Sequence, residues 1–413
     1  MQIDGLDNGH IDRRMLLKAV SGTGLALGGL AGSVGVTAQE SDGERTLLDL
    51  DDRARFNIGY ATPHGAELAR EAANGVVHEI DPIGAITIES TLDAVQDLAG
   101  SDHIEFVEID PVYRLILPPQ AVQDRDPTGQ TVPWGIERIG APTAHAAGIR
   151  GESAHVAVIN TGIDPTHEDL RANVGDGIAV TPCRGECETA WDDDFGHGTH
   201  VAGTIGALDN RLGVLGVAPE ATLHSAKVLN SNGVGFASDV ALGILWTAAQ
   251  GYDVANMSLG GPFSTVVQDA LEFAAERDVL LVAAAGNQSG PVSYPASADE
   301  VIAVSATTET DDLAVFSNVG PEIELAAPGV DVLSTLPNDR YAELSGTSMA
   351  APHVSGTGAL LAGIGYSAEE ARTFMKETAE DLGLPPEEQG SGLVTAAAVA
   401  ERRPKKSGRK TAP

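Results

Sequence analysis

The stretch Leu344-Ser-Gly-Thr-Ser-Met-Ala-Ala-Pro-His-Val-Ser-Gly356 decides how this chain folds. Small residues surround Ser348, and an apolar run from Gly356 to Leu361 follows them. Pro352 suits the first turn of a helix, where its missing N–H costs little. We therefore expect Ser348 at a tight turn that opens a buried helix, where free N–H groups and the helix dipole favour negative charge.

Composition narrows the class of protein. The 413 residues predict two or three domains, and the 42% apolar content is enough for a full core. The formal net charge is −34, from 59 acidic and 25 basic residues, of which only six are Lys. This sign argues against a nucleic-acid partner. Acid excess with few Lys indicates a halophilic protein whose fold loosens in dilute buffer, where carboxylates repel one another.

The N-terminus predicts export. Arg13-Arg14-Met-Leu-Leu-Lys18 resembles a twin-arginine motif, and the Gly-rich, weakly apolar residues 19–34 follow it. Small residues at Thr37-Ala38 complete a signal peptide over residues 1–39, the alternative being an ordinary basic N-terminus. The apolar stretch is a poor membrane span, so we expect a secreted, extracellular product without stable membrane association.

Residues 52–117 predict a small ferredoxin-like α+β unit with the order β-α-β-β-α-β. We expect strands over 53–60, 76–79, 85–89 and 103–113, a helix from Thr62-Pro63 to Asn74-Gly75, and a second helix from Ser90 to Gly100. Residues 118–129, rich in Pro, Gln, Asp and Gly, resemble an exposed, cleavable linker.

Residues 130–401 alternate apolar strands with helical stretches. This alternation predicts an α/β fold with a doubly wound, mostly parallel sheet and helices on both faces. The expected strands include 156–159, 223–229, 254–258, 279–284 and 301–306, with helices at 237–250 and 266–276. Residues 402–413 hold six basic residues and are expected to form a disordered tail.

Four polar stretches stand at strand ends or helix starts, where functional groups gather in a doubly wound sheet. They are residues 156–164, 195–203 and 283–287 and the Ser348 turn. Ser348 needs a base, for which His197 is the candidate, and the amide of Asn287 can donate to an oxyanion. His200 and His353 are alternatives, but they lie inside small-residue helices, where a packed histidine is expected. His197-x-x-His200 lacks the Glu of a zinc-protease helix, so the pattern argues against catalysis by a metal ion.

In this order the four stretches resemble the subtilisin family of serine proteases, most closely the halophilic halolysins. The resemblance covers most of residues 130–362, and residues 52–117 resemble the inhibitory propeptide of that family. It implies a serine endopeptidase that acts on polypeptides and is made with its prodomain as an intramolecular inhibitor, cut off near residues 114–129. We expect a monomer. The resemblance also implies that His197 is the general base, Ser348 the nucleophile and Asn287 the oxyanion donor.

Asn160 departs from the family, which has Asp at this position. That Asp accepts a hydrogen bond from the histidine ring, fixes its tautomer and stabilises the imidazolium. An Asn carries no charge and can present its NH₂ to the ring, so we expect a much weakened protease. Asp164 has no positional match to the triad acid. The alternatives are a non-catalytic peptide-binding protein and, more weakly, a serine esterase.

The resemblance also implies two segments that hold a substrate strand between them, and a primary pocket with apolar preference, because none of these segments is charged. β-Strand pairing with the substrate would supply the affinity. The expected substrate-binding residues are Gly233, Val234, Gly235, Ser258, Leu259, Gly260, Ala284, Ala285, Gly286 and Ser293.

Structural Ca²⁺ is implied in the same way, through an all-oxygen ligand set. The ligands would be the side chains of Gln130, Asp169 and Asn210 and the carbonyls of Leu208, Leu212 and Val214. Cys183 and Cys187 are the only cysteines, and they lie in an insertion before His197. A disulfide is expected in an exported protein, with two free thiols as the alternative.

Overall fold

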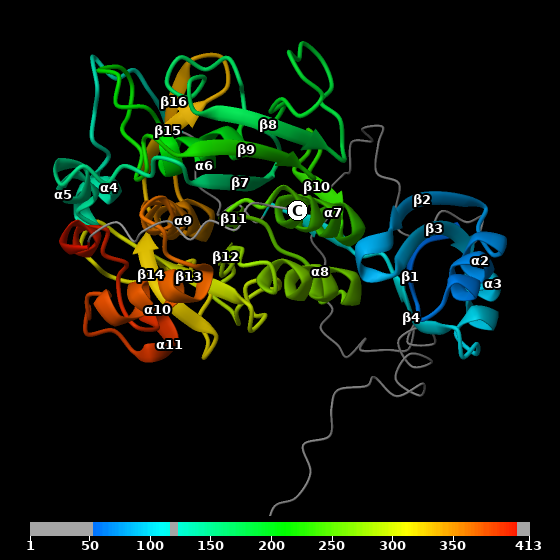
Figure 1. The fold of residues 1–413 in the computed structure, drawn as a ribbon. Helices are drawn as coiled ribbons and strands as arrows, with labels where there is room; N and C mark the ends of the chain where they lie inside the picture. Colours follow the sequence, from blue (N-terminus) through cyan, green and yellow to red (C-terminus); the bar gives the residue numbers. More distant parts are fainter. Residues whose placement is uncertain (1–52, 116–122, 403–413) are drawn as a thin grey trace, which may run out of the picture. The chain divides into compact units, whose positions relative to one another are not determined.

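The structure, a computed structural model, describes residues 53–115 and 123–402. The predicted signal peptide and all but Arg402 of the predicted basic tail lie outside the described residues. The chain divides into two compact units, Met1–Ile109 and Asp110–Pro413 (Figure 1).

The first unit is a four-stranded antiparallel sheet in the order β2-β3-β1-β4, packed against two helices. Its core includes Phe56, Ile58, Ile86 and Ile88. The chain order is the β-α-β-β-α-β order expected from the sequence. The elements are β1 (Arg53–Tyr60), α2 (Pro63–Glu71), β2 (Gly75–Ile80), β3 (Ala85–Thr91), α3 (Leu92–Leu98) and β4 (Ile104–Ile109).

Helix α2 begins as predicted but ends early. The hydroxyl of Thr62 accepts a hydrogen bond from Gly65 N–H, which makes it the N-cap. The helix ends at Glu71, however, and not at Asn74-Gly75. The N–H of Asn74 donates to the carbonyl of Glu89, so the sheet takes up the residues that were expected to close the helix.

Two other boundaries in this region were wrong. The N-cap of α3 is Thr91, whose hydroxyl accepts from Ala94 N–H, while Ser90 donates its hydroxyl to the carbonyl of Ala72. The single strand expected over 103–113 is two strands, β4 and β5 (Val112–Arg114), interrupted at Asp110-Pro111. Pro has no N–H to donate, and the chain leaves the first sheet there.

The second unit is built on a seven-stranded sheet, all of whose pairings are parallel, in the order β14-β13-β12-β11-β7-β9-β8. The predicted α/β class is therefore confirmed. Helix α9 packs over β11 to β14, with α6 and α10 against it, while α7 and α8 cover the other face (Figure 1). The strands are β6 (Gln123–Arg125), β7 (His155–Asn160), β8 (Val174–Ala179), β9 (Thr222–Lys227), β10 (Val234–Phe236), β11 (Val254–Met257), β12 (Leu280–Ala284), β13 (Val301–Thr307), β14 (Ile323–Pro328), β15 (Val332–Leu336) and β16 (Arg340–Leu344). The helices are α4 (Trp134–Arg138), α5 (Ala141–Ala146), α6 (His197–Gly206), α7 (Ala237–Gln250), α8 (Thr265–Ala275), α9 (Thr347–Gly363), α10 (Ala368–Thr378) and α11 (Pro386–Gln389).

Strand β7 lies where the winding direction of the sheet reverses. The chain continues from β7 to β8 and β9 on one side, and returns to β11, β12, β13 and β14 on the other. At such a point the loops beyond the carboxyl ends of neighbouring strands diverge and leave a crevice for ligands. Strand β7 ends at Asn160, so this residue stands at the reversal point.

Helix α9 begins at Thr347, so Pro352 lies inside the helix and not in its first turn as expected. A proline there cannot donate to the carbonyl four residues earlier, which is that of Ser348. The hydroxyl of Ser258 donates to this carbonyl instead, at 2.9 Å. The side chain at the end of β11 thereby compensates for the proline in a helix that is buried from Thr347 to Leu361.

Two histidines link the amino ends of three strands. The N–H of Asp176 on β8 donates to Nδ1 of His224 on β9, at 3.2 Å, so this nitrogen carries no proton. The other ring nitrogen of His224 therefore donates to Nδ1 of His155 on β7, at 2.9 Å. The ring of Tyr252 stacks on His224 at 3.8 Å. Burial, followed by the electrostatic influence of the neighbouring His155 ring, lowers the pKa of His224 to about 4.

This pair should make the fold acid-sensitive. Because the pKa of His224 is lower in the folded than in the unfolded state, falling pH protonates the unfolded chain first. The stability present above pH 6.5 is lost progressively toward pH 4, by at most about 3 kcal/mol. Thermal unfolding between pH 8 and pH 4 should therefore show a smaller loss for His224→Gln than for the parent. Equal losses would contradict the role of this histidine.

Candidate active site

Three of the four predicted stretches begin or end elements at the carboxyl edge of the large sheet. Asn160 is the last residue of β7, His197 the first residue of α6, and Asn287 follows β12. Ser348 is the second residue of α9, which packs against α6. All four side chains are buried.

The imidazole of His197 is held by Asn160. Its Nδ1 lies 2.9 Å from Oδ1 of Asn160, which also accepts the N–H of Thr161 at 2.8 Å. A main-chain N–H requires an acceptor, so the Asn160 atom facing the ring is oxygen and not the NH₂ group. Of the two arrangements open to an Asn at this position, the structure therefore has the one in which the amide accepts through its oxygen. The proton of a neutral His197 is on Nδ1, and its Nε2 carries the lone pair.

The site keeps His197 neutral. Burial, with a smaller contribution from His200, lowers the pKa of His197 to about 3. An amide at position 160 supplies no charge that would raise it. Within residues 53–115 and 123–402, neither Nε2 of His197 nor Nδ2 of Asn160 has a hydrogen-bond partner. The ring can accept a proton, but little in its surroundings stabilises the resulting cation.

The turn before Ser348 is tied to Asn287. The N–H and the hydroxyl of Thr347 donate to Oδ1 of Asn287 at 2.8 and 2.9 Å, and the N–H of Gly286 donates to the Thr347 hydroxyl at 3.0 Å. These bonds orient the Asn287 amide with its oxygen on the helix, so Nδ2 is its donor end. Among the described residues, the N–H of Ser348 donates to no main-chain carbonyl, so this group at the start of α9 can also bind an anion.

No hydrogen bond joins the Ser348 hydroxyl to His197 in the part of the chain described. Such bonds are often long in substrate-free sites and tighten when substrate binds.

The two alternative histidines, His200 and His353, have other hydrogen-bond partners. His200 Nε2 lies 3.1 Å from the carbonyls of Val332 and Ala342, and His353 Nδ1 lies 2.9 Å from the carbonyl of Met349. Both are packed side chains, as the sequence led us to expect.

The predicted substrate segments already hold a strand of the same chain. Strand β5 pairs antiparallel with β10, and the N–H of Leu115 donates to the carbonyl of Gly233 at 3.0 Å. On the other side, Arg114 exchanges two main-chain hydrogen bonds with Gly260, at 2.9 and 3.1 Å. Residues 112–115 therefore lie between Gly233–Gly235 and Ser258–Gly260, the position expected for a substrate strand.

Tyr113 of this strand is fully buried, and its hydroxyl donates to the carbonyl of Pro262 at 2.9 Å. A Cβ atom at Gly261 would lie 2.5 Å from the tyrosine ring. Only glycine therefore leaves room for an aromatic side chain here. This pocket was not predicted from the sequence, although Gly261 directly follows a predicted segment.

The predicted primary-pocket residues are held together by Asn318, which the sequence analysis missed. Ser293 N–H donates to the carbonyl of Ala285 at 2.8 Å. The amide of Asn318 donates to the same carbonyl and to the Ser293 hydroxyl, at 3.1 Å each. Gly286 has φ 110°, and a Cβ there would meet both side chains. Asn318 follows β13 in a loop without a recognisable motif, so no sequence signal marked it.

The predicted calcium ligands also come together. The amide nitrogen of Gln130 is placed 2.7 Å from the carbonyl of Leu208 and 3.4 Å from that of Val214. Asp169 Oδ2 accepts the N–H of Val214, while its buried Oδ1 has no partner among the described residues. Burial raises the pKa of Asp169 to about 7.

The chemistry of this donor set fits a hard cation. Asn210 completes it, with Oδ1 accepting the N–H of Leu212 at 2.8 Å. Across the described ranges, no cluster of three or more His, Cys, Asp or Glu side chains is arranged to hold a metal ion. The set around Asp169 instead combines one carboxylate with amide and carbonyl oxygens, the ligands that Ca²⁺ accepts.

Comparison with known proteins decides the family. The profile described as "Subtilase family" matches residues 151–392, more than half of the chain. This chain belongs to the subtilase family. An alkaline protease of Alkalihalobacillus alcalophilus is 42% identical over 330 residues, covering 78% of this chain and 81% of that protein. As a subtilase, the protein is a serine endopeptidase.

Two further relatives match shorter and longer parts of the chain. Subtilisin Savinase of Lederbergia lenta is 47% identical over 274 residues, covering 65% of this chain and 99% of that protein. Alkaline elastase YaB of Bacillus sp. strain YaB is 38% identical over 391 residues, covering 92% of this subtilase and 98% of that protein.

None of the helices described in residues 53–115 and 123–402 has the length and apolar character needed to cross a membrane.

Replacing Asn160 with Asp should raise the pKa of His197. A carboxylate in place of the amide, 2.9 Å from Nδ1, favours the imidazolium. The ring should therefore titrate at a pH about 1–3 units higher than in the parent. The measurement is ¹⁵N NMR of the histidine rings in Ser348→Ala protein, which cannot digest itself through this serine. His224 serves as the internal control, and an unmoved His197 titration would refute the assigned contact.

Proposed function

We propose that this subtilase is a secreted endopeptidase that hydrolyses polypeptides through an acyl-enzyme. In this proposal Ser348 is the nucleophile, His197 the general base and Asn287 an oxyanion donor. The observation that carries it is the hydrogen bond from His197 Nδ1 to Asn160 Oδ1, because it leaves the lone pair of Nε2 as the base. The family pattern supports the same roles.

The reaction then follows from the residues present. Ser348 Oγ attacks the scissile carbonyl while its proton passes to His197 Nε2. Negative charge develops on the carbonyl oxygen, where Nδ2 of Asn287 and the N–H of Ser348 stabilise it. His197 returns the proton to the leaving amine, and a water molecule repeats the sequence to release the acyl group.

The weak point is the imidazolium formed in the first step. Asn160 offers it a dipole but no charge. In serine proteases with this triad, replacing the acid by its amide lowers kcat by about 10⁴, even though the geometry is retained. We therefore propose that the protein as written is a weakened protease. The second candidate is a peptide-binding protein without turnover, which the strand already held between Gly233 and Gly260 favours.

Peptide hydrolysis by the parent and by Asn160→Asp tests the assignment. In molar salt with calcium, the Asp form should gain several orders of magnitude in kcat, up to about 10⁴. Its activity should begin to fall at a higher pH than that of the parent as the medium is acidified, because the pKa of its His197 is higher. Ser348→Ala in the Asp form is the matched inactive control.

The other outcomes are equally informative. Equal activity of the two forms would mean that another group supports His197, and the account of Asn160 would be wrong. Two folded but inactive forms, each recovered as a single uncut chain, would favour the peptide-binding candidate. Hydrolysis of a small ester without any peptide cleavage would indicate an esterase.

We further propose that residues 52–117 are an inhibitory propeptide. The support is that residues 112–115 occupy the expected substrate position. Just before them, the carboxylate of Asp110 accepts the N–H and the hydroxyl of Ser238, at 3.0 and 2.7 Å, at the start of α7. Because the paired segment extends through Leu115, the maturation cut should lie C-terminal to it, within the expected region that ends at residue 129.

The wider setting is also a proposal. The charge of −34 supports a halophilic protein, as in the halolysins, and the twin-arginine pattern at Arg13-Arg14 supports export of a folded chain. We propose a monomer without nucleic-acid partners or stable membrane association. The absence of charge in Gly233–Gly235, Ser258–Gly260 and Ala284–Gly286 supports a preference for apolar side chains in the primary pocket.

We propose Ca²⁺ at the set around Asp169, where a cation would offset the cost of the buried carboxylate and contact its partnerless Oδ1. Gln130, Asn210 and the carbonyls of Leu208, Leu212 and Val214 would hold it. The ion would stabilise the fold and take no part in the reaction.

Chelation should therefore lower the unfolding temperature of the parent. The Asp169→Asn variant should unfold at a lower temperature than the parent, and this temperature should change little with chelator or added calcium. Unfolding is followed by circular dichroism in molar and in dilute sodium chloride. If chelator does not change the unfolding temperature of the parent at either salt concentration, the calcium site is excluded. If the parent unfolds at the same temperature in molar and in dilute sodium chloride, the halophilic proposal is excluded.

A further inference from the structure

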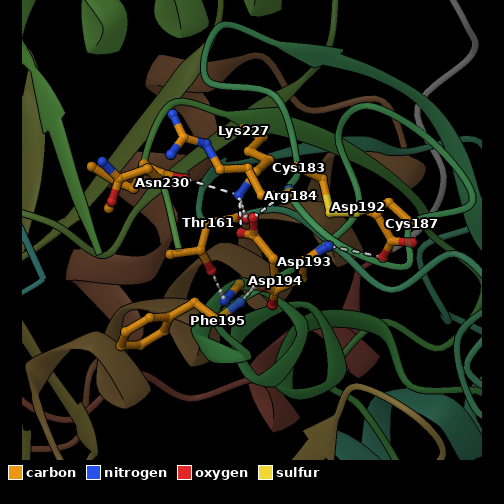
Figure 2. A network of polar contacts seen from close by, with 12 residues as sticks. Thr161, Cys183, Arg184, Cys187, Asp192, Asp193, Asp194, Phe195, Lys227 and Asn230 are labelled. Atoms are coloured by element: carbon orange, nitrogen blue, oxygen red, sulfur yellow. Dashed lines mark hydrogen bonds and ion pairs between the residues drawn. A yellow bond between two sulfur atoms is a disulfide. The ribbon is translucent and has the colours of Figure 1, made fainter. Parts of the chain in front are cut away.

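The insertion before His197 is closed by the Cys183–Cys187 disulfide, which confirms the expected pairing. The N–H of Cys183 donates to the carbonyl of Ala190 at 2.7 Å, so the loop is joined at its base. The insertion ends at three consecutive carboxylates, Asp192 to Asp194, next to a lysine on β9 (Figure 2). The proposed reaction uses none of these charges.

Lys227 is the last residue of β9 and is completely buried. Its ammonium contacts three oxygens: the carbonyl of Thr161 at 2.5 Å, Asp194 Oδ1 at 2.6 Å and the carbonyl of Leu229 at 3.0 Å. These contacts match the three N–H donors of an ammonium group. A buried charge is tolerated only when it is paired and hydrogen-bonded, so the three oxygens are fixed relative to one another.

Two of these oxygens belong to the segments that carry the proposed base and its partner. Thr161 directly follows Asn160, and Asp194 lies three residues before His197. Figure 2 shows Thr161 and Asp194 beside the end of the Lys227 side chain. The same ammonium therefore ties the end of β7 to the loop that leads into α6.

Further hydrogen bonds transmit this restraint to the start of α6. The hydroxyl of Thr161 accepts the N–H of Gly198 at 2.9 Å. Asp193 accepts the N–H groups of Phe195 and Gly196 through Oδ1, and the N–H and hydroxyl of Thr199 through Oδ2, all within 2.7–3.0 Å. The main chain on both sides of His197 is thus bonded to residues next to the ion pair.

The disulfide loop supports the pair from outside. The second oxygen of Asp194, Oδ2, accepts the N–H of Arg184 at 2.8 Å, and Arg184 lies within the loop closed by Cys183 and Cys187. The side chain of Asp194 is only 8% exposed, so water has little access to the carboxylate.

We propose that Lys227 and Asp194 are positioning residues, whose buried ion pair sets the placement of His197 relative to Asn160 and Ser348. The inference deepens the proposed function and rests on it, since it concerns the same base. It assigns a role to the insertion, because the Cys183–Cys187 loop holds Asp194 in place. A small misplacement of a reacting group lowers the rate of a chemical step strongly, by up to about 10²-fold for 1 Å.

The test is the double variant Lys227→Met/Asp194→Asn, which removes both charges and leaves neither buried alone. Made in the Asn160→Asp form, it should lower kcat for a peptide substrate by about 10–100-fold, with KM within about twofold. The matched control is Arg372→Met/Glu324→Gln. This ion pair joins α10 to β14, five strands away from β9 in the sheet, and it should affect thermal stability but not kcat.

A second measurement does not depend on activity. In Ser348→Ala protein, the double variant should shift the ¹⁵N signals and the titration of His197, while the control pair leaves them unchanged. If the double variant does not fold, the milder Asp194→Asn is used, since its amide oxygen still accepts one bond. Unchanged His197 signals and unchanged kcat in a folded variant would overturn the proposal.

The two measurements separate the possible failures. If the Asn160→Asp parent itself does not cleave peptides, the proposed function fails, and the NMR signals of His197 alone decide whether the ion pair positions the ring. If the control pair lowers kcat as much as the double variant does, the effect is general destabilisation and the positioning role is refuted.

Discussion

The carboxyl edge of the seven-stranded parallel sheet is the constraint on which the rest of this subtilase depends. All strands of that sheet run in the same direction, so the chain must return through helices on the faces, and its polar turns collect at one edge. Asn160, Lys227 and Asn287 stand at or just beyond the ends of β7, β9 and β12 for this reason. Helices α6 and α9 begin near the same edge and contribute His197 and Ser348.

Asn160 gives the site a hydrogen bond to His197 but no negative charge. The amide oxygen of Asn160 accepts from Thr161 N–H and faces His197 Nδ1, so orientation and tautomer are preserved. Asn160 supplies no charge to the imidazolium, and burial lowers the pKa of His197 to about 3. The geometry of the contact with His197 is therefore present with Asn, whereas a negative charge at this position would require Asp.

The ion pair of Lys227 and Asp194 lies close to the loops that carry Asn160 and His197. Its ammonium is satisfied by one carboxylate and two carbonyls, so its charge is neutralised locally. The pair therefore acts through geometry, by joining the end of β7 to the segment before α6. The disulfide loop joins the same network through the N–H of Arg184.

The sequence by itself determined the class of the fold and indicated the candidate residues of the site. Buried parallel strands are continuous apolar runs, and the motifs around His197, Asn287 and Ser348 carry chemistry that few other roles require. The helix start at Thr62-Pro63 was also evident, because cap and proline act locally. Composition argued against a nucleic-acid partner without any knowledge of the fold, because net charge is a sum over residues.

The tertiary structure decided whatever depends on partners distant in sequence. Pro352 is accommodated inside α9 because Ser258, 90 residues away from Ser348, donates to the orphaned carbonyl. Asn74 and Gly75 joined the sheet because Glu89 offered a carbonyl, and Asn160 faces His197 with its oxygen because Thr161 needs an acceptor. The charge of Lys227 within an apolar strand was visible in the sequence, but its partner Asp194 was not. Hydrogen bonds between remote segments have no local pattern, so only the folded chain could show them.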